Sequence, residues 1–409
     1  MTAVLSTAVV AGSIWAAGYL RDPAPAAGQQ AVSHGRAVAH DLDAPPSLAA
    51  AESGLLPWRL PAPVSREAVV PGQHGRLIVL GGLTPDGASS SGVYAVRTRT
   101  GAARRIGALG VAFHDAAAAV TGGRALVFGG GSAASIATVQ GYTLPGRRGR
   151  AAAPASLPKA RSDLAAVTMG ATTYLLGGYD GARPDAAVLA TTDGLAFRTV
   201  AALRVPLRYP AVAALGGKIY VFGGEAVTGS HAGVPVNTIQ AVDPARHSST
   251  IVGKLPESLA GALAVTMGGE VFVAGGESTV PQPRAPGMGT TQYRARAPGT
   301  AGESSGAATV TVPTIWAFQP STGRLLPAGR LQVPVSHAAV AVTGSMAWIV
   351  GGESHGHLVA AVQMIRPNKA FGMAGARGAG SPYFGARLLV ADRGNNRLLL
   401  LTDTLHMAW

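Results

Sequence analysis

Cysteine is absent from the 409 residues, so no disulfide framework stabilises this chain and its redox compartment cannot be read from thiol usage. Charged residues make up only 13% of the sequence and aromatic residues 5%. Neither the Gly-Lys-Ser/Thr spacing of phosphate-binding loops nor a Ser-His-Asp spacing is present. The common catalytic motifs are therefore missing, and the informative features are those that recur along the chain.

Basic residues outnumber acidic ones by 33 to 20, which gives a net charge of +13. A charge of this size can favour nucleic acid or anionic surfaces. However, the arginines stand singly or in pairs, and the densest run is Arg147-Arg148-Gly149-Arg150. This dispersion argues against a nucleic-acid partner.

An apolar run that ends in a glycine pair occurs six times, first as Arg76-Leu-Ile-Val-Leu-Gly-Gly82. The pairs begin at Gly81, Gly129, Gly177, Gly223, Gly275 and Gly351, in steps of 48, 48, 46, 52 and 76. Each run is too short for a helix and is bounded by glycine, so it predicts a strand buried on both faces. Glycine at its end removes the Cβ where backbones crowd and permits a positive φ in the following turn.

Three further strands are predicted in each repeat. In the fourth repeat, the small residues Ala211–Leu215 suit an innermost strand, and Gly216-Gly217 suits a tight hairpin turn. A third strand follows at 239–242, and then an outer strand. A period of about 50 residues with four strands is typical of a β-propeller blade, so we expect an all-β, six-bladed propeller.

In these repeats the chain resembles the kelch family, over residues 55–367. It departs from the family at the outer-strand tryptophan, which only Trp58 keeps. Because Trp58 precedes the first glycine pair, residues 55–60 are predicted to supply the last strand of the sixth blade. Such closure would remove an open sheet edge and join the two ends of the ring.

The N-terminal residues 2–20 carry no charge and would span about 28 Å as a helix, enough to cross a bilayer. We expect residues 1–21 to be a transmembrane anchor, with a cleaved signal peptide or a buried soluble segment as alternatives. Residues 22–54 are rich in Pro and Ala and are interpreted as a linker. The expected location is the cell membrane, single-pass, with the propeller outside the cytoplasm.

Two other segments interrupt or follow the repeats. Residues 278–309 are rich in Pro, Gly, Ser, Thr and Arg, and are expected to be a disordered loop inserted in the fifth repeat. In the C-terminal segment 368–409, the stretch 385–401 resembles an NHL repeat through its Asp392 and its Gly394-Asn-Asn-Arg397 turn. Because one such unit cannot bury its own faces, we expect either a truncated second propeller or a hairpin leaning on the kelch domain.

Turns that enter the innermost strands and turns that leave the glycine pairs should emerge on one face of a propeller. The first set supplies Arg66, His114, Arg161, Arg208 and Ser336, and the second supplies Tyr179, Glu225, Glu277 and Glu353. We predict that these residues form a ligand-binding rim, with Arg161 and Arg208 converging on a carboxylate or sulfate. The alternative is a solvated rim of ion pairs worth about 1 kcal/mol or less each.

No catalytic residue, metal or cofactor is predicted. The pair His355 and His357 lacks nearby carboxylates other than Glu353. Some kelch-like propellers belong to copper radical oxidases, which need a cysteine–tyrosine crosslink that this chain cannot form. The expected function is a non-catalytic, membrane-tethered module that binds a protein or a glycan in a bacterial cell envelope. The alternative is a sugar epimerase, mutarotase or lyase, because six-bladed kelch mutarotases would use rim Glu and Arg as acid–base and anchoring groups.

Overall fold

The computed structural model describes residues 51–146, 155–228, 231–279, 309–368, 388–392, 397–401 and 407–408. These residues form strands and turns, and none of them builds a helix that would cross a bilayer. The expected anchor at 2–20 and most of the insertion at 278–309 lie outside the described residues. Both therefore stay predictions.

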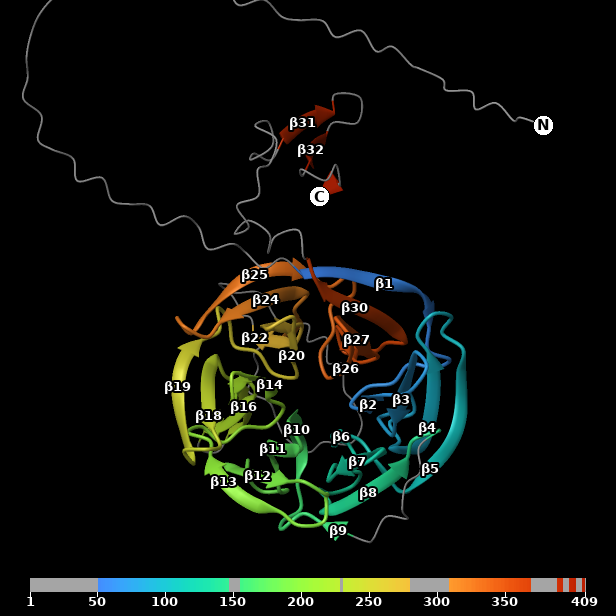
Figure 1. The fold of residues 1–409 in the computed structure, drawn as a ribbon, viewed down its shortest axis with the longest axis vertical. Coiled ribbons are helices and arrows are strands. Elements are labelled where there is room, and N and C mark those ends of the chain that lie inside the picture. Colours follow the sequence, from blue (N-terminus) through green and yellow to red (C-terminus); the bar gives the residue numbers. More distant parts are fainter. Residues whose placement is uncertain are drawn as a thin grey trace, which may run out of the picture. The chain divides into compact units, whose positions relative to one another are not determined.

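Six four-stranded antiparallel sheets stand around a ring as blades, as the sequence predicts (Figure 1). From the innermost strand outward, blade one contains β2 (Ala68–Pro71), β3 (Arg76–Leu80), β4 (Ser90–Arg97) and β5 (Ala103–Phe113). Blade two contains β6 (Ala117–Thr121), β7 (Arg124–Phe128), β8 (Thr138–Thr143) and β9 (Ala155–Ser156). Blade three contains β10 (Ser162–Met169), β11 (Thr172–Tyr179), β12 (Ala187–Thr191) and β13 (Arg198–Ala202).

The second half of the ring is built in the same way. Blade four contains β14 (Ala211–Leu215), β15 (Lys218–Phe222), β18 (Thr238–Asp243) and β19 (Ser248–Lys254). Blade five contains β20 (Leu263–Met267), β21 (Glu270–Ala274), β24 (Thr314–Gln319) and β25 (Arg324–Arg330). Blade six contains β26 (Ala339–Thr343), β27 (Met346–Val350), β30 (Ala361–Pro367) and, as its outer strand, β1 (Ala51–Arg59).

Strand β1 closes the ring. It pairs antiparallel with β30, from Ala51 opposite Pro367 to Arg59 opposite Ala361. Trp58 lies in this strand, and its ring contacts Gly101 in the turn between β4 and β5 of blade one. The predicted closure is confirmed, and the strand begins four residues earlier than expected.

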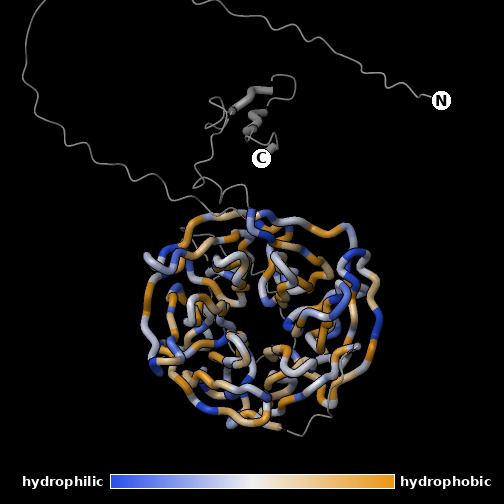
Figure 2. Tube along the Cα trace, viewed as in Figure 1, coloured by the Kyte–Doolittle hydropathy of each residue, from blue (hydrophilic) through white to orange (hydrophobic). Residues whose placement is uncertain are grey.

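The hydrophobic core consists of the interfaces between neighbouring blades. Six clusters of buried apolar residues are present in the described part of the chain, and each joins two adjacent sheets, as in the Phe222–Phe318 contact between blades four and five. Apolar residues accordingly run along the strands of every blade (Figure 2). Strands buried on both faces explain why the repeats contain continuous apolar runs rather than an alternating pattern.

The glycine pairs permit the close approach of one blade to the next. At Gly223 and Gly224 φ is 55° and 99°, and a Cβ on Gly223 would clash with the carbonyl of Leu259 in the next blade. The amide of Gly224 donates to that same carbonyl at 2.7 Å. The glycines therefore place blade-to-blade hydrogen bonds where a side chain would not fit.

Glutamines reinforce alternate blade interfaces. Gln240 in β18 accepts a hydrogen bond from the amide of Val205 and donates one to its carbonyl, at 3.0 and 3.1 Å. Gln140 and Gln363 bind Val111 and Val333 in the same way. The side-chain amide of each glutamine thus pairs with the backbone of the neighbouring blade in the way that an adjacent strand would.

Smaller sheets lie outside the four-stranded blades. Blades four, five and six each extend beyond the glycine pair into a short hairpin: β16 (Glu225–Thr228) with β17 (His231–Pro235), β22 (Glu277–Thr279) with β23 (Thr309–Thr311), and β28 (Glu353–Ser354) with β29 (His357–Leu358). Near the C-terminus, β31 (Leu388–Asp392), β32 (Arg397–Leu401) and β33 (Met407–Ala408) form a three-stranded antiparallel sheet.

Candidate functional site

Six residues, one from each blade, form a closed ring of backbone hydrogen bonds around the central pore. Each amide donates to the carbonyl of the equivalent residue in the preceding blade, at 2.8–3.2 Å. Each member has a φ between 49° and 60°. The members are Arg66, Asp115, Asp163, Tyr209, Gly261 and His337. This shared backbone conformation directs the side chains of the five non-glycine members to one place, the mouth of the pore.

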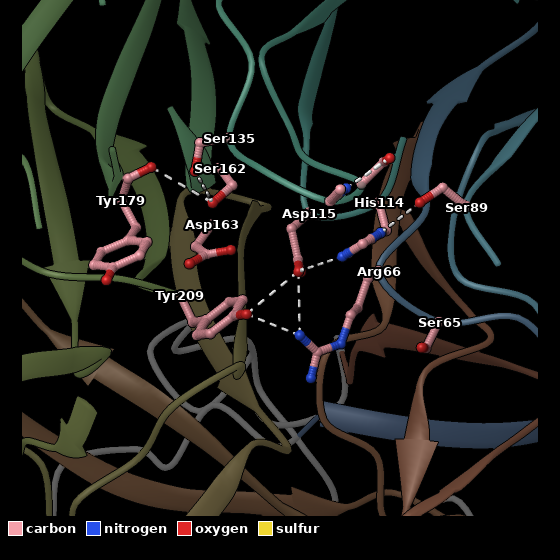
Figure 3. Close-up of polar contacts among 12 residues, drawn as sticks. Ser65, Arg66, Ser89, His114, Asp115, Ser135, Ser162, Asp163, Tyr179 and Tyr209 are labelled. Carbon is pink, nitrogen blue, oxygen red and sulfur yellow. Dashed lines mark hydrogen bonds and ion pairs between the residues drawn. The ribbon is translucent and has the colours of Figure 1, made fainter. Parts of the chain in front are cut away.

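Arg66 of blade one reaches across the pore to Tyr209 of blade four (Figure 3). Its Nη1 donates to the Tyr209 hydroxyl at 2.8 Å and to Asp115 Oδ2 at 3.1 Å, and its Nε donates to Glu353 Oε1 at 2.7 Å. The Tyr209 hydroxyl in turn donates to Asp115 Oδ2 at 3.3 Å. These contacts fix the guanidinium and the phenol in one arrangement.

Arg208 forms the second cationic centre of the mouth. Its Nε donates to Asp163 Oδ2 at 2.6 Å, and its Nη2 donates to the Tyr209 hydroxyl at 3.3 Å. The guanidinium also lies 4.5 Å from the ring centre of Tyr179. Arg66 and Arg208 are thus both neutralised by carboxylates, so neither offers an unpaired guanidinium to a ligand carboxylate or sulfate.

Three carboxylates directly follow the glycine pairs of blades four, five and six. Glu225 forms a β-bridge with Arg208, Glu277 with Ala260, and Glu353 with Ser336. The Ser336 hydroxyl donates to Glu277 Oε1 at 2.9 Å. Among the predicted rim residues, Arg208 thus pairs with Glu225 within blade four, and Ser336 contacts Glu277 of blade five and Glu353 of blade six.

The mouth continues over blades two and three. His114 Nδ1 lies 2.8 Å from the Ser89 hydroxyl, and its Nε2 lies 3.7 Å from Asp115 Oδ2 (Figure 3). Tyr179 pairs with Pro184 beyond the third glycine pair. His114 reaches the mouth through Asp115, and Tyr179 reaches it through the guanidinium of Arg208.

A pocket of about 120 Å³ lies at the ring. Its walls are the six ring residues and the residue that follows each of them. Five of these following residues are apolar, namely Ala116, Leu164, Pro210, Ala262 and Ala338. The sixth is Glu67, which is 5% exposed and has no hydrogen-bond partner for either carboxyl oxygen within the described residues.

Burial raises several pKa values at the mouth. Burial and the repulsion of Asp115 raise the pKa of Asp163 to about 6, against the attraction of Arg208. Burial, with repulsion from Asp163 and Glu277, raises the pKa of Glu225 to about 7. Burial and the nearby Arg66 lower the pKa of His337, so its imidazole is neutral at pH 7.

Arg161 does not lie at the mouth, which corrects the prediction. Its side chain is 2% exposed, and it donates to Asp185 at 2.7 Å and to the carbonyls of Gly177 and Ala187. The position equivalent to Arg208 in blade three is Ser162, which contacts the backbone of Tyr179. A shift of one residue along an extended segment turns the side chain to the opposite side.

Four mouth residues escaped the sequence analysis: Asp115, Asp163, Tyr209 and His337. A usable signal existed, because the ring residue stands 14 positions before the first glycine of the pair in blades two to six, and 15 before it in blade one.

Within the described part of the chain, no group of three His, Cys, Asp or Glu side chains is placed to hold a metal ion.

Comparison with known proteins identifies the repeat. The Kelch motif family matches residues 206–256, which span blade four. The solved structure of YjhT is 15% identical, with a TM-score of 0.57, and the match covers 75% of this chain and 95% of that one. At this identity the likeness concerns the fold alone. No curated protein matches the sequence. The family match gives no support to the NHL-like prediction for the C-terminal segment.

Proposed function

We propose that this six-bladed propeller with a kelch repeat is a non-catalytic module that binds the end of a glycan at the pore mouth. A scaffold of this kind hosts many activities, so the proposal rests on the mouth itself.

The observation that carries the proposal is a small pocket lined by side chains already fixed in place. Its volume of about 120 Å³ is well below the ~300–1,000 Å³ of pockets that enclose a whole small molecule, so it suits one group of a larger ligand rather than the whole. The Arg66–Asp115–Tyr209 contacts hold its polar groups in fixed positions. A preorganised site loses little side-chain entropy on binding.

Sugar hydroxyls suit this lining because each of them can donate and accept a hydrogen bond. Carboxylates such as Glu225 and Glu277 accept, whereas the guanidiniums of Arg66 and Arg208 donate. A protein ligand would instead need a broad surface of about 800 Å² on each partner. A small pocket can select the end of a chain of sugars without a broad contact surface. The pocket therefore favours a glycan over a protein as the ligand.

Calorimetry on the purified protein tests this proposal with a panel of hexoses, N-acetylhexosamines, hexosamines and uronic acids. Tyr209→Phe removes the hydroxyl that joins the two arginines and should weaken binding by about tenfold. Tyr220→Phe is the matched control, because Tyr220 packs on Phe318 in the core of blades four and five. Absence of binding across the panel would reject the proposal.

A sugar mutarotase or epimerase is the second candidate, favoured by the acids at the mouth. Proton exchange on a sugar needs an acid and a base that both titrate near neutral pH. Asp163 and Glu225, with pKa values raised by burial to about 6 and about 7, meet that condition. Exchange spectroscopy by NMR would detect faster interconversion of sugar anomers, which Asp163→Asn should abolish.

We further propose that the propeller is displayed outside the cytoplasm by the uncharged segment 2–20. The full chain should then fractionate with membranes and resist carbonate extraction. A mature N-terminus downstream of residue 20 would replace the anchor with a cleaved signal peptide.

A further inference from the structure

The contact between Arg66 and Tyr209 divides the pore mouth into two unequal halves. Blades one and four stand opposite each other in the ring, so this hydrogen bond of 2.8 Å crosses the pore. Asp115 and Asp163 lie on one side of it, and Gly261 and His337 lie on the other. The two halves differ in how their polar groups are satisfied.

The half formed by blades two and three is internally satisfied. Asp115 accepts hydrogen bonds from Arg66 and Tyr209, and Asp163 accepts one from Arg208. The polar groups of its side chains already form hydrogen bonds and ion pairs with one another. A ligand would have to break these ion pairs in order to bind there.

The half formed by blades five and six differs, because one of its two ring residues has no side chain and the other is a histidine that packs against it. Gly261 contributes no side chain, and the His337 ring lies over it, because a Cβ on Gly261 would come within 2.8–2.9 Å of three ring atoms. The ring meets Tyr209 edge-on, with centroids 4.6 Å apart. Within the described residues, the ring contact of His337 is with Tyr209, and neither ring nitrogen has a hydrogen-bond partner.

Carboxylates lie near this half of the mouth, outside the lining of the pocket itself, and the charges of Glu277 and Glu353 act on His337. Glu225, Glu277 and Glu353 begin the hairpins of blades four, five and six, directly after their glycine pairs. Arg66 neutralises Glu353, and Ser336 donates to Glu277. Glu67 also lines the pocket, but it adds no negative charge at pH 7, because burial raises its pKa to about 8. Acceptors therefore outnumber donors on this side of the mouth.

We infer that the half-pocket over Gly261 binds a protonated primary amine, and that the preferred ligand is a glycan end carrying a free amino group. The inference rests on the proposed glycan-binding function and specifies its ligand class. An ammonium group offers three donors, which suit the imidazole of His337 and the carboxylates of Glu277 and Glu225. The neutral state of His337, caused by burial and by Arg66, which lower its pKa, keeps it an acceptor.

The charge of the whole protein bears on this preference. With a net charge of +13 the protein repels cations in general. An amine that binds must therefore be attracted locally, at the mouth. Binding of an amine to this basic protein would not be a non-specific charge effect.

The experiment compares glucosamine, N-acetylglucosamine and glucose by calorimetry with the full protein at pH 7. Glucosamine should bind at least about tenfold more tightly than the other two sugars, because acetylation removes the charge and two donors. Glu277→Gln should weaken glucosamine binding by about tenfold or more while it keeps the acceptor for Ser336. Gly261→Ala should abolish binding by displacing His337.

The matched control is Glu270→Gln. Glu270 begins the strand whose far end leads through Gly275-Gly276 to Glu277, so it stands at the opposite end of the same blade. This variant should bind glucosamine like the wild type. An equal loss in both variants would assign the effect to net charge and overturn the inference.

The remaining outcomes separate this inference from the proposed function. Equal binding of all three sugars would overturn the amine preference and leave the glycan function standing. Binding of lysine amide without any sugar, lost in Glu277→Gln, would support the amine seat and overturn the glycan function. No binding by any of these compounds would overturn both.

Discussion

Replacing Glu67 with glutamine tests the protonation state of the acidic side chain buried in the pocket wall. Its carboxyl lies between blades six and one, close to Gly351, and is 5% exposed. Neither oxygen has a hydrogen-bond partner among the described residues, and burial raises the pKa of Glu67 from 4.5 to about 8. The folded protein therefore holds this carboxyl protonated at pH 7. Glutamine has the same shape but does not titrate.

The magnitude follows from proton linkage. Between pH 4.5 and about 8 the unfolded chain releases the proton of Glu67 while the folded chain keeps it, so the free energy of unfolding falls as the pH rises. At pH 7, about 2.5 pH units above the unfolded pKa, the loss is about 3 kcal/mol at ~1.4 kcal/mol per unit. At pH 5 the same reasoning gives less than about 1 kcal/mol. Glu67→Gln removes this contribution.

Urea unfolding followed by tryptophan fluorescence, at pH 5 and pH 7, measures the difference between Glu67→Gln and the wild type. We expect the variant to gain about 2–3 kcal/mol relative to the wild type on going from pH 5 to pH 7. Glu257→Gln changes a partly exposed carboxyl and serves as the control for the loss of one negative charge. A difference that does not vary with pH would refute the protonated, buried state of Glu67.

Three further predictions concern stability, and each is checked by the same unfolding measurement or by solubility. Removal of residues 1–60 should expose the edge of blade six and cause aggregation, whereas removal of residues 1–50 should leave the ring folded; equal solubility would contradict closure by β1. Gln240→Ala should lose about 2–3 kcal/mol, because Gln240 is fully buried and both its hydrogen bonds to Val205 would be lost. Arg161→Ala should lower the free energy of unfolding by about 3 kcal/mol or more, because Asp185 would lose its ion-pair partner. Unchanged stability together with lost ligand binding would instead mean that Arg161 acts at the pore mouth.

The fold was predictable because its signals are local and repeated. Each glycine pair marks a place where two blades meet, and six copies in register specify six blades. Trp58 indicated the closing strand for the same reason. It marks an outer strand that precedes the first repeat, so this strand must pair with a blade formed elsewhere in the chain. Residues that serve packing thus keep a spacing that a single sequence can show.

The site was less predictable because it depends on side-chain direction at one residue per blade. Arg208 and Glu225 were found, but Arg161 stands one position too early and turns into its own blade. Tyr209 and His337 carry no motif, and only alignment on the glycine pairs would have placed them. Which partners they meet across the pore depends on the order of blades, and local patterns do not contain this information.

The ring of backbone hydrogen bonds has neither a first member nor a last one. Every amide in it donates to the preceding blade and every carbonyl accepts from the next. Separation of any two neighbouring blades would therefore open the ring. The seam between blades six and one lies at Arg66 and His337, and β1 holds it from the outside. A ligand bound at the mouth would contact residues on both sides of that seam. It would therefore stabilise the closed ring, including the pairing of β1, without contacting β1 itself.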